Sequence, residues 1–552
     1  MEFLNITKNI FCVMFKSRFS MPLKMKKPHV IIINPDQMRA DSLHHLGNPA
    51  AVTPNLDKIV QEDAVSFDSA FCQNPICTPS RCSFFTGLYP HVFGHRTISF
   101  MQYQHEPSLL KTMKENGYHV WMNDRNDFLP AQVPEIFGKY CDEFYIPQDL
   151  SPLPAPKNPN HRGEKGEGSY YSFFVGEVNC DESGRYYDSD ASCVNALAQQ
   201  IRDMDSNKPL CAFLGLLAPH PEYLVEEPYF SSIDRKKLPE RITLEDETQK
   251  SEMLRGFREI YGLSNWSEEQ FDELRATYLG MCMKVDHFFG EIVSALKEKG
   301  IYDDTLIVFL SDHGDYTGDY DVVEKAQNTF EDCIVKVPLI IKPPKNQKVK
   351  FGISSALTEL VDMYATVLDY TDISAPETHF GNSLRDVISG DDKENRKYVF
   401  CEGGRRPDET HCNSAAKNAG EENIYYPRFK MQATDACTKG AMIRGRKYKY
   451  IYRSYEQDEL YDLENDPNEL KNLALETGHE KIILDMKLKM LEWYQQTCDI
   501  VPQRPDERMN DEMFISKLTQ RMKADKIDQI RSFVADGFSV MEALQKIKGE
   551  EM

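Results

Sequence analysis

HVIIINPDQ, residues 29–37, is an apolar run that ends in the polar residues Asp36 and Gln37. A continuous apolar run of this length is typical of a strand buried on both faces, as in a parallel sheet. Runs of the same kind follow along the chain: HVWMN (119–123), LCAFLGLL (210–217), TLIVFL (305–310) and VPLIIKP (337–343). Helical patterns separate these runs, so the sequence predicts alternating strands and helices.

This alternation predicts an α/β protein in which helices sandwich a large mixed, mostly parallel sheet. Thr53-Pro54-Asn55 is typical of a helix N-cap followed by proline, and it predicts a helix through Val60. In open sheets of this kind, ligands bind outside the carboxyl ends of the strands. Three of the runs lead there into chemically reactive residues: Asp36, His220 and Asp312-His313.

The character of the chain changes after about residue 395. The segment AMIRGRKYKYIYR (441–453) alternates and is rich in tyrosine, which predicts a smaller C-terminal antiparallel sheet subdomain. We therefore expect an N-terminal extension at 1–26, a large domain at 27–395, an α+β subdomain at 396–500 and a helical tail at 501–552. Residues 145–190 are rich in Pro, Gly, Ser and charge and predict a long surface loop or lid.

Composition restricts the partners. Of the 552 residues 41% are hydrophobic, which suits a globular protein, and the formal net charge is −22. Nucleic acids and anionic membranes require basic surfaces, so we expect neither as a partner. A site for an anionic substrate would need a local metal ion or a cluster of Arg and Lys against this acidic background.

The cysteines indicate the compartment. The chain has 14 cysteines, scattered singly and without a CxxC pair, which points to a reducing environment. The apolar run NIFCVMF (9–15) is too short for a signal peptide core, and no stretch approaches the ~20 apolar residues of a membrane span. We expect a cytoplasmic protein.

The most specific motif is Cys77-Thr78-Pro79-Ser80-Arg81, extended through Thr86-Gly87. A thiol at a helix start lies near unpaired backbone N–H groups, which favour an anion. Arg81 comes one turn later and can hold an oxyanion with its guanidinium fork. The alternative is an ordinary buried cysteine before a helix.

This segment resembles the signature of type I, formylglycine-dependent sulfatases, which belong to the alkaline phosphatase superfamily. The resemblance covers residues 27–475. It implies that a formylglycine-generating enzyme oxidises Cys77 to formylglycine during maturation. In that family the hydrated side chain attacks the sulfur of a sulfate ester, and its second hydroxyl then expels sulfate.

A metal site is the second implication. A carboxylate at the end of an apolar strand is costly unless something pairs with it, and a hard divalent cation is a natural partner for Asp36. Alone, such a residue would more often be a cap or turn residue. The resemblance assigns the metal to Asp36, Cys77, Asp312 and His313, and Gln37 is either a ligand through its amide oxygen or a neighbour. Calcium is expected, with manganese or magnesium as the alternatives.

The remaining catalytic positions also follow from the resemblance. His220, in Ala218-Pro219-His220-Pro221, matches the histidine that protonates the leaving alcohol, a role that suits a pKa near neutral. Lys325 matches the lysine that binds sulfate. Arg125 and Asn126 lie where many sulfatases have Gly-Lys-Trp-His, and the resemblance makes both candidate substrate contacts, with Arg125 in place of the lysine that contacts sulfate. Asp127 replaces the histidine of that element.

Two departures leave the reaction open. Many sulfatases have two Asp where this chain has Asp36-Gln37, and Asp-Asn where it has Asp312-His313. The pattern found here looks like choline sulfatases and phosphonate monoester hydrolases. We predict a sulfuric ester hydrolase, with a phosphonate monoester or phosphodiester hydrolase as the alternative and a binding protein with an inactive site as a third reading.

The sequence indicates the class of substrate less specifically than the reaction. A sulfated sugar is the expected small-molecule substrate, with aryl or steroid sulfates as alternatives. The tyrosine-rich part of the lid and the segment EGGRRPDETHC (402–412) are expected to shape specificity. Arg405, Arg406 and His411 are its candidate substrate contacts, and the sequence leaves homo-oligomerisation open.

Overall fold

The structure of the protein is a computed structural model, and it describes residues 27–147, 168–178, 188–205, 208–413, 420–503, 508 and 510–549. The predicted extension at 1–26 and much of the predicted lid lie outside these residues. Over the described ranges, no helix combines the length and the apolar character that crossing a membrane requires.

A sheet of eight strands forms the centre of the protein, in the order β11-β2-β10-β9-β1-β7-β4-β5. Its strands are β1 (His29–Pro35), β2 (Val65–Phe67), β4 (His119–Asn123), β5 (Glu143–Tyr145), β7 (Leu210–Leu216), β9 (Thr305–Leu310), β10 (Leu339–Lys342) and β11 (Gly352–Ser354). β1 pairs in parallel with β7 and β9, whereas β10 is antiparallel to β9 and β2. The predicted large, mostly parallel sheet is confirmed.

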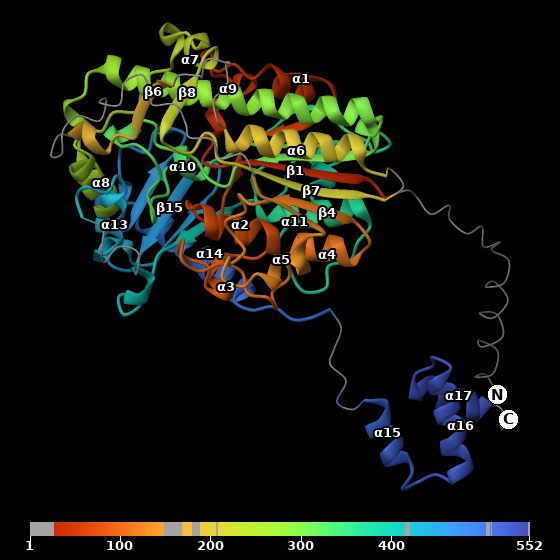
Figure 1. Ribbon diagram of the computed structural model, residues 1–552. Helices are drawn as coiled ribbons and strands as arrows, with labels where there is room; N and C mark the ends of the chain where they lie inside the picture. The colour runs from red at the N-terminus through yellow and green to blue at the C-terminus, as the bar shows by residue number, and fades with distance from the viewer. Residues whose placement is uncertain are drawn as a thin grey trace, which may run out of the picture. The chain divides into compact units, whose positions relative to one another are not determined.

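Helices cover both faces of this sheet (Figure 1). One face carries α1 (Pro54–Glu62), α6 (Ser189–Asp203) and α9 (Glu268–Lys299), and the other carries α2 (Cys77–Thr86), α4 (Leu109–Glu115), α5 (Glu135–Tyr140) and α11 (Val361–Thr371). Side chains of a strand alternate between its faces, so Ile31 and Val30 of β1 enter different cores.

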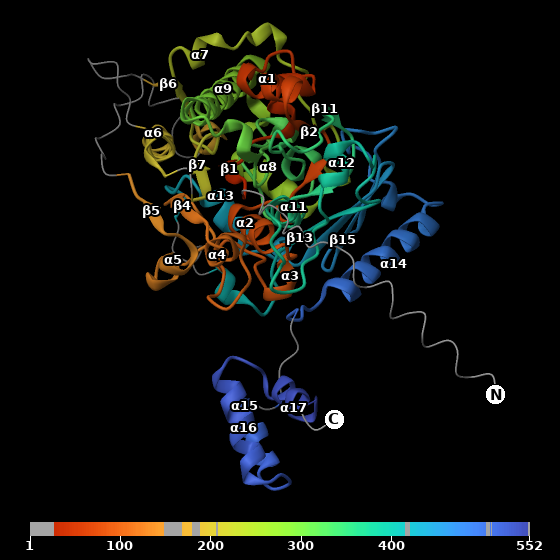
Figure 2. The same cartoon turned by 90° about the vertical axis from the view of Figure 1, so that its right-hand side faces the viewer.

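A smaller antiparallel sheet contains β13 (Val399–Gly403), β14 (Gly440–Arg444), β15 (Tyr448–Arg453) and β16 (Glu459–Asp462). The long helix α14 (Glu480–Thr497) packs against it, as Figure 2 shows. Trp493 of α14 stacks on Phe400 of β13 with ring centroids 4.5 Å apart. The predicted C-terminal antiparallel sheet is therefore confirmed.

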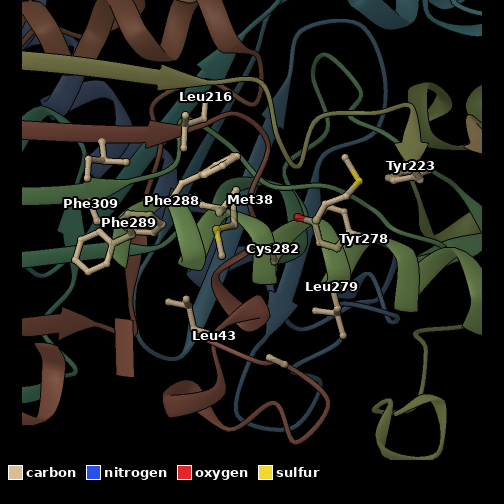
Figure 3. Packing of buried hydrophobic residues seen from close by; sticks show 14 of the residues in the cluster. Met38, Leu43, Leu216, Tyr223, Tyr278, Leu279, Cys282, Phe288, Phe289 and Phe309 are labelled. Carbon is tan, nitrogen blue, oxygen red and sulfur yellow. The ribbon is translucent and has the colours of Figure 1, made fainter. Parts of the chain in front are cut away.

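The connecting segments contain further short elements. The helices are α3 (Pro90–Phe93), α7 (Tyr229–Ser232), α8 (Glu252–Tyr261), α10 (Asp332–Val335), α12 (Arg385–Ser389) and α13 (Tyr426–Gln432). Two-stranded pairs join β3 (Ala70–Phe71) to β12 (Thr358–Glu359) and β6 (Phe174–Val178) to β8 (Tyr223–Glu226). Figure 3 shows part of the core between α9 and the central sheet. There Phe289 of α9 meets Phe309 of β9, with ring centroids 5.7 Å apart.

Contacts divide the chain into two compact units. The first ends at Ile500, and the second comprises Val501–Met552 with Pro376–Thr378. In the second unit α15 (Asp511–Leu518), α16 (Ala524–Ala535) and α17 (Val540–Gly549) pack around isoleucines such as Ile527 and Ile530. The helical tail was predicted to begin at the same point, while the boundary expected near 395 falls inside the first unit and stays a prediction.

Candidate active site and metal centre

The carboxyl ends of four neighbouring strands meet at one edge of the central sheet, and a predicted site residue follows each of them. Asp36 follows β1, Arg125 follows β4, His220 follows β7 and Asp312 follows β9. Cys77 is the first residue of α2, and its sulfur lies within 4.8 Å of a carboxylate oxygen of Asp36. Residues that are far apart in the sequence therefore share one site.

Asp36, Asp312 and His313 form a group that can hold a metal ion. All three side chains are buried, and their ligand atoms lie within 4.8 Å of one another. His313 Nδ1 donates to the carbonyl oxygen of Gly314 at 2.9 Å, which leaves the lone pair of Nε2 facing Asp36 Oδ1 at 3.5 Å. Neither of these two atoms has a hydrogen-bond partner among the described residues. Buried polar atoms of this kind are costly without a ligand, so the donor set fits a divalent cation.

Asp127 brings a further carboxylate to residue 77. One of its oxygens lies within 4.8 Å of the ligand atoms of Asp36 and Cys77, and Oδ2 has no hydrogen-bond partner in the described part of the chain. From the sequence we expected Asp127 only to replace a histidine, because nothing in the pattern marks a ligand position. Burial and the charges of Asp127 and Asp36 raise the pKa of the Cys77 thiol to about 12. The unmodified thiol is therefore a poor nucleophile at neutral pH.

Two arginines offset the acids. Arg81 places Nε 2.8 Å from Asp312 Oδ2 and Nη2 2.9 Å from Asp36 Oδ2. Arg125 Nη2 lies 2.7 Å from the same oxygen of Asp36. Burial opposes ionisation of Asp36, but Arg125 and Arg81 hold its pKa well below the usual range. The carboxylate is charged and available to a cation at neutral pH.

Gln37 and Lys325 contact each other beside this group. Lys325, which is buried, donates to Gln37 Oε1 at 2.6 Å, and Gln37 Nε2 donates to Asp315 Oδ2 at 2.6 Å. The amide oxygen of Gln37 thus binds the predicted sulfate-binding lysine, which supports its role as a neighbour of the metal site. Its role as a direct ligand stays a prediction.

His220 lies on the loop after β7 with a fixed ring orientation. Its Nδ1 donates to the carbonyl oxygen of Pro221 at 2.6 Å, so Nε2 is the atom left to exchange a proton. Burial and the charges of Lys325 and Arg125 lower the pKa of His220 well below its usual value, although Asp36 opposes the shift. The imidazole is neutral in the free protein near pH 7.

Close backbone packing positions Arg125. Asn123 makes two hydrogen bonds of 2.8 Å with the backbone of Gly215 in β7. A Cβ atom on Gly215 would lie 2.0 Å from the carbonyl oxygen of Arg125, so only glycine permits this approach. The same carbonyl accepts a hydrogen bond from Arg81 at 3.0 Å.

The predicted substrate contacts differ in how they relate to the acid cluster. Asn126 touches it through its carbonyl oxygen, which accepts a hydrogen bond from Arg81 at 3.4 Å, while its side-chain oxygen accepts from the backbone of Phe128 and Leu129. None of the contacts described for Arg405, Arg406 and His411 brings them to the cluster. Among the described residues, Arg405 donates only to backbone carbonyls, including that of Thr434 at 3.1 Å. Arg406 is 61% exposed in its side chain and pairs with Asp408, and His411 rests against Phe100. Their contact with substrate stays a prediction.

Comparison with known proteins gives a consistent result. The family described as "Sulfatase" matches residues 28–373, and that described as "N-sulphoglucosamine sulphohydrolase, C-terminal" matches residues 411–496. An arylsulfatase of Clostridium perfringens is 26% identical, over 81% of this chain and 90% of its own length. A choline-sulfatase of Rhizobium meliloti is also 26% identical, over 81% of this chain and 82% of its own length. The phosphonate monoester hydrolase of Agrobacterium radiobacter has a similar fold, with a TM-score of 0.66, 22% identity, and coverage of 87% of this chain and 100% of that protein.

Proposed function

The chain belongs to the sulfatase family, and from that premise we propose that it releases inorganic sulfate from a sulfated sugar. The observation that carries the proposal is the pair of buried, unpartnered atoms Asp36 Oδ1 and His313 Nε2 beside residue 77. A cation held by these atoms would lie beside the residue that the sulfatase signature makes the nucleophile, and this supports the proposal. A family match to the C-terminal part of N-sulphoglucosamine sulphohydrolase supports a sugar as the substrate.

A modified residue 77 and a metal ion would supply the central chemistry. Residue 77, once oxidised to formylglycine and hydrated, supplies the attacking hydroxyl, and a divalent cation supplies positive charge to stabilise the transferring oxygens. Asp36, Asp312 and His313 would hold the cation. Calcium suits the carboxylates, whereas the imidazole nitrogen also accommodates manganese.

The chain's own cations would bind the sulfate group. Arg81 and Lys325 are buried beside residue 77, and Arg125 is 28% exposed in its side chain at the same cluster. An incoming sulfate ester brings negative charge that competes with Asp36 for Arg81 and Arg125, and with Gln37 for Lys325. Their fixed positions stabilise charge that develops on the sulfate oxygens without reorganisation of solvent.

His220 would protonate the leaving oxygen. The ring must carry a proton on Nε2 for this step, whereas the free protein holds it neutral because its pKa is lowered. A bound sulfate places a negative charge nearby and raises that pKa, so binding itself would help to prepare the acid.

The test is sulfate release by protein produced together with a formylglycine-generating enzyme. Intact mass would verify conversion of Cys77, and ion chromatography would quantify sulfate from sulfated monosaccharides, sulfated disaccharides, 4-nitrophenyl sulfate and choline sulfate. We expect release from at least one sulfated sugar, and none from Cys77→Ala. Absence of sulfate release from every ester by fully converted protein would contradict the proposal.

A second candidate is a phosphonate monoester hydrolase. The observation that favours it is Gln37, whose amide stands where many sulfatases have a second Asp. Hydrolysis of a phenyl phosphonate monoester in the same assay, at a kcat/KM above that of every sulfate ester, would decide for this reaction. Calcium as the native metal, the maturation enzyme, a cytoplasmic location and homo-oligomerisation also stay predictions.

A further inference from the structure

A buried carboxylate–guanidinium pair lies next to the predicted sulfate-binding lysine. Glu324 Oε1 is 2.9 Å from Arg428 Nη2 and 3.4 Å from Lys325 Nζ. Glu324 is fully buried, and its backbone has a φ of 65°, a conformation that residues with a side chain rarely adopt. Arg428 comes from α13, about a hundred residues later in the chain. Neither residue belongs to the sulfatase signature.

Several polar atoms in and beside this pair lack a hydrogen-bond partner. Oε2 of Glu324, Nε of Arg428 and the hydroxyl of the neighbouring Tyr261 are buried and make no hydrogen bond with the described residues, and Oε1 of Glu324 has only its ion pairs. Charge attraction alone does not satisfy a buried ion pair, which needs hydrogen bonds for its remaining lone pairs and protons. The unsatisfied atoms therefore point to a ligand with hydrogen-bonding groups.

Aromatic rings surround the pair on the side of the predicted lid. The guanidinium of Arg428 lies 4.5 Å from the centroid of the Tyr425 ring, and Phe173 packs on Tyr425 with ring centroids 5.4 Å apart. Burial lowers the pKa of Arg428, but the charges of Glu324, the neighbouring tyrosines and Cys77 raise it above its usual value. The geometric link to the acid cluster is Lys325, which lies beside Glu324 and donates to Gln37.

We propose that Glu324 and Arg428 bind neighbouring hydroxyl groups of a sulfated sugar and so determine the substrate class; this inference rests on the proposed function. A hydroxyl both donates and accepts, so adjacent hydroxyls satisfy a carboxylate and a guanidinium together. The apolar face of a sugar ring suits the nearby aromatic side chains. The trimethylammonium group of choline has no hydrogen-bond donor or acceptor, so it would leave both groups of the pair unsatisfied. An aryl group leaves the same atoms unsatisfied.

The kinetic test compares two substrates in each variant. The measured quantity is the ratio of kcat/KM for N-acetylglucosamine 6-sulfate or galactose 6-sulfate to kcat/KM for 4-nitrophenyl sulfate. Arg428→Gln and Glu324→Gln should each lower this ratio by about 10–100-fold, as expected when a hydrogen bond to a charged group is lost. Lys430→Gln removes a positive charge from the exposed side of the same helix and should leave the ratio unchanged.

Some outcomes would overturn the inference while the proposed function stands. One is an equal fall in kcat/KM for both substrates in Arg428→Gln, which indicates a structural role. Another is an unchanged ratio of the two kcat/KM values in both Arg428→Gln and Glu324→Gln, which would mean that neither side chain contacts the sugar. Circular dichroism and the unfolding midpoint would identify a variant that fails to fold.

A binding measurement separates the two proposals further. Calorimetry with Cys77→Ala, which cannot be matured, would measure the Kd of N-acetylglucosamine 6-sulfate and of galactose 6-sulfate. Adding Arg428→Gln to this background should weaken binding of at least one sugar about 10-fold or more, even if the wild-type protein hydrolyses no sulfate ester. Unchanged binding of both sugars, or no binding to the parent variant, would overturn the inference.

Discussion

At the scale of single residues, the acidic chain concentrates its positive charge where an anion would bind. The net charge is −22, yet Arg81, Arg125 and Lys325 gather beside Asp36. Each of these cations already contacts the side chain of an acid or an amide. A bound sulfate group would replace that side chain as the hydrogen-bond acceptor, without moving the cation. The composition shows only that such a cluster would be needed; the folded chain supplies its members from three different segments.

His220 should matter most when the leaving group is poor. A sugar alcohol needs protonation as it departs, whereas 4-nitrophenolate does not. We expect His220→Ala to lower kcat for N-acetylglucosamine 6-sulfate by about 10²–10⁴-fold and to affect 4-nitrophenyl sulfate much less. His287→Ala, an exposed histidine of α9, is the control. Equal losses on both substrates would argue against proton donation.

The pH dependence follows from the lowered pKa of His220. An acid catalyst acts in its protonated form, which disappears as pH rises through a pKa that lies below the usual 6.5. Above that point kcat/KM for the sugar sulfate should fall about tenfold per pH unit. The descending limb of kcat should lie at higher pH, because bound sulfate raises the pKa. A pH profile shared with 4-nitrophenyl sulfate would contradict this assignment.

Metal binding should be measurable without catalysis. After treatment with a chelator, addition of calcium or manganese should raise the unfolding midpoint, because a ligand at 100 times its Kd stabilises the folded state by about 2.7 kcal/mol. Asp36→Asn should remove most of this gain, since Asp36 belongs to both candidate ligand groups. Asp246→Asn changes an exposed acid and should leave the metal-induced gain in the unfolding midpoint unchanged. An undiminished gain in Asp36→Asn would exclude the proposed site.

At the scale of elements, the loop that carries His220 is held by the start of α6. Asp190 accepts hydrogen bonds of 2.8 Å from the backbone amides of Leu217 and Ala218. Asp190→Ala should therefore loosen the loop, lowering the free energy of unfolding by about 1–3 kcal/mol. A displaced His220 should also reduce kcat for a sugar sulfate by about 10-fold.

Controls separate the loop from the helix. Asp190→Asn keeps one acceptor and should show an intermediate loss of kcat. Asp203→Ala changes the exposed far end of α6 and should leave kcat unchanged. Loss of stability in Asp190→Ala with an unchanged kcat would show that Asp190 supports the helix and not the position of His220.

The predicted strands correspond closely to those of the structure because long apolar runs leave few alternatives. The run 29–34 became β1, and 305–310 became β9. The antiparallel direction of β10 was not predictable, because its apolar pattern is the same in either direction. The short strands β2 and β11 have too few residues for a periodic signal. Thr53 does precede α1, but its hydroxyl donates to Asp57 instead of capping the helix.

At the scale of the whole molecule, the site combines residues at the ends of strands, which the sequence predicts, with residues that only tertiary packing brings together. Asp36 and Asp312 were predictable because parallel strands converge at one edge of the sheet. Arg428 was not, because its helix α13 carries no motif and comes to lie beside Glu324 only through the packing of the segment that joins β13 to β14. Arg405 shows the converse: a loop arginine in a suggestive segment donates to backbone carbonyls instead.

The helical tail should be dispensable for folding of the first unit. Its helices form a small core of their own that includes Ile515, Ile527 and Ile530. Before these helices begin, the backbone amide of Thr378 donates to the carbonyl oxygen of Val501 at 3.0 Å. A chain ending at Gln503 keeps that contact and should unfold at a midpoint within about 2 °C of the full chain, because it keeps the cores of the first unit intact. Hydrolysis of 4-nitrophenyl sulfate should also be retained. A large fall in the unfolding midpoint of the shortened chain would contradict this prediction, because it would mean that the tail stabilises the first unit. Light scattering of both chains would show separately whether the tail sets the oligomeric state.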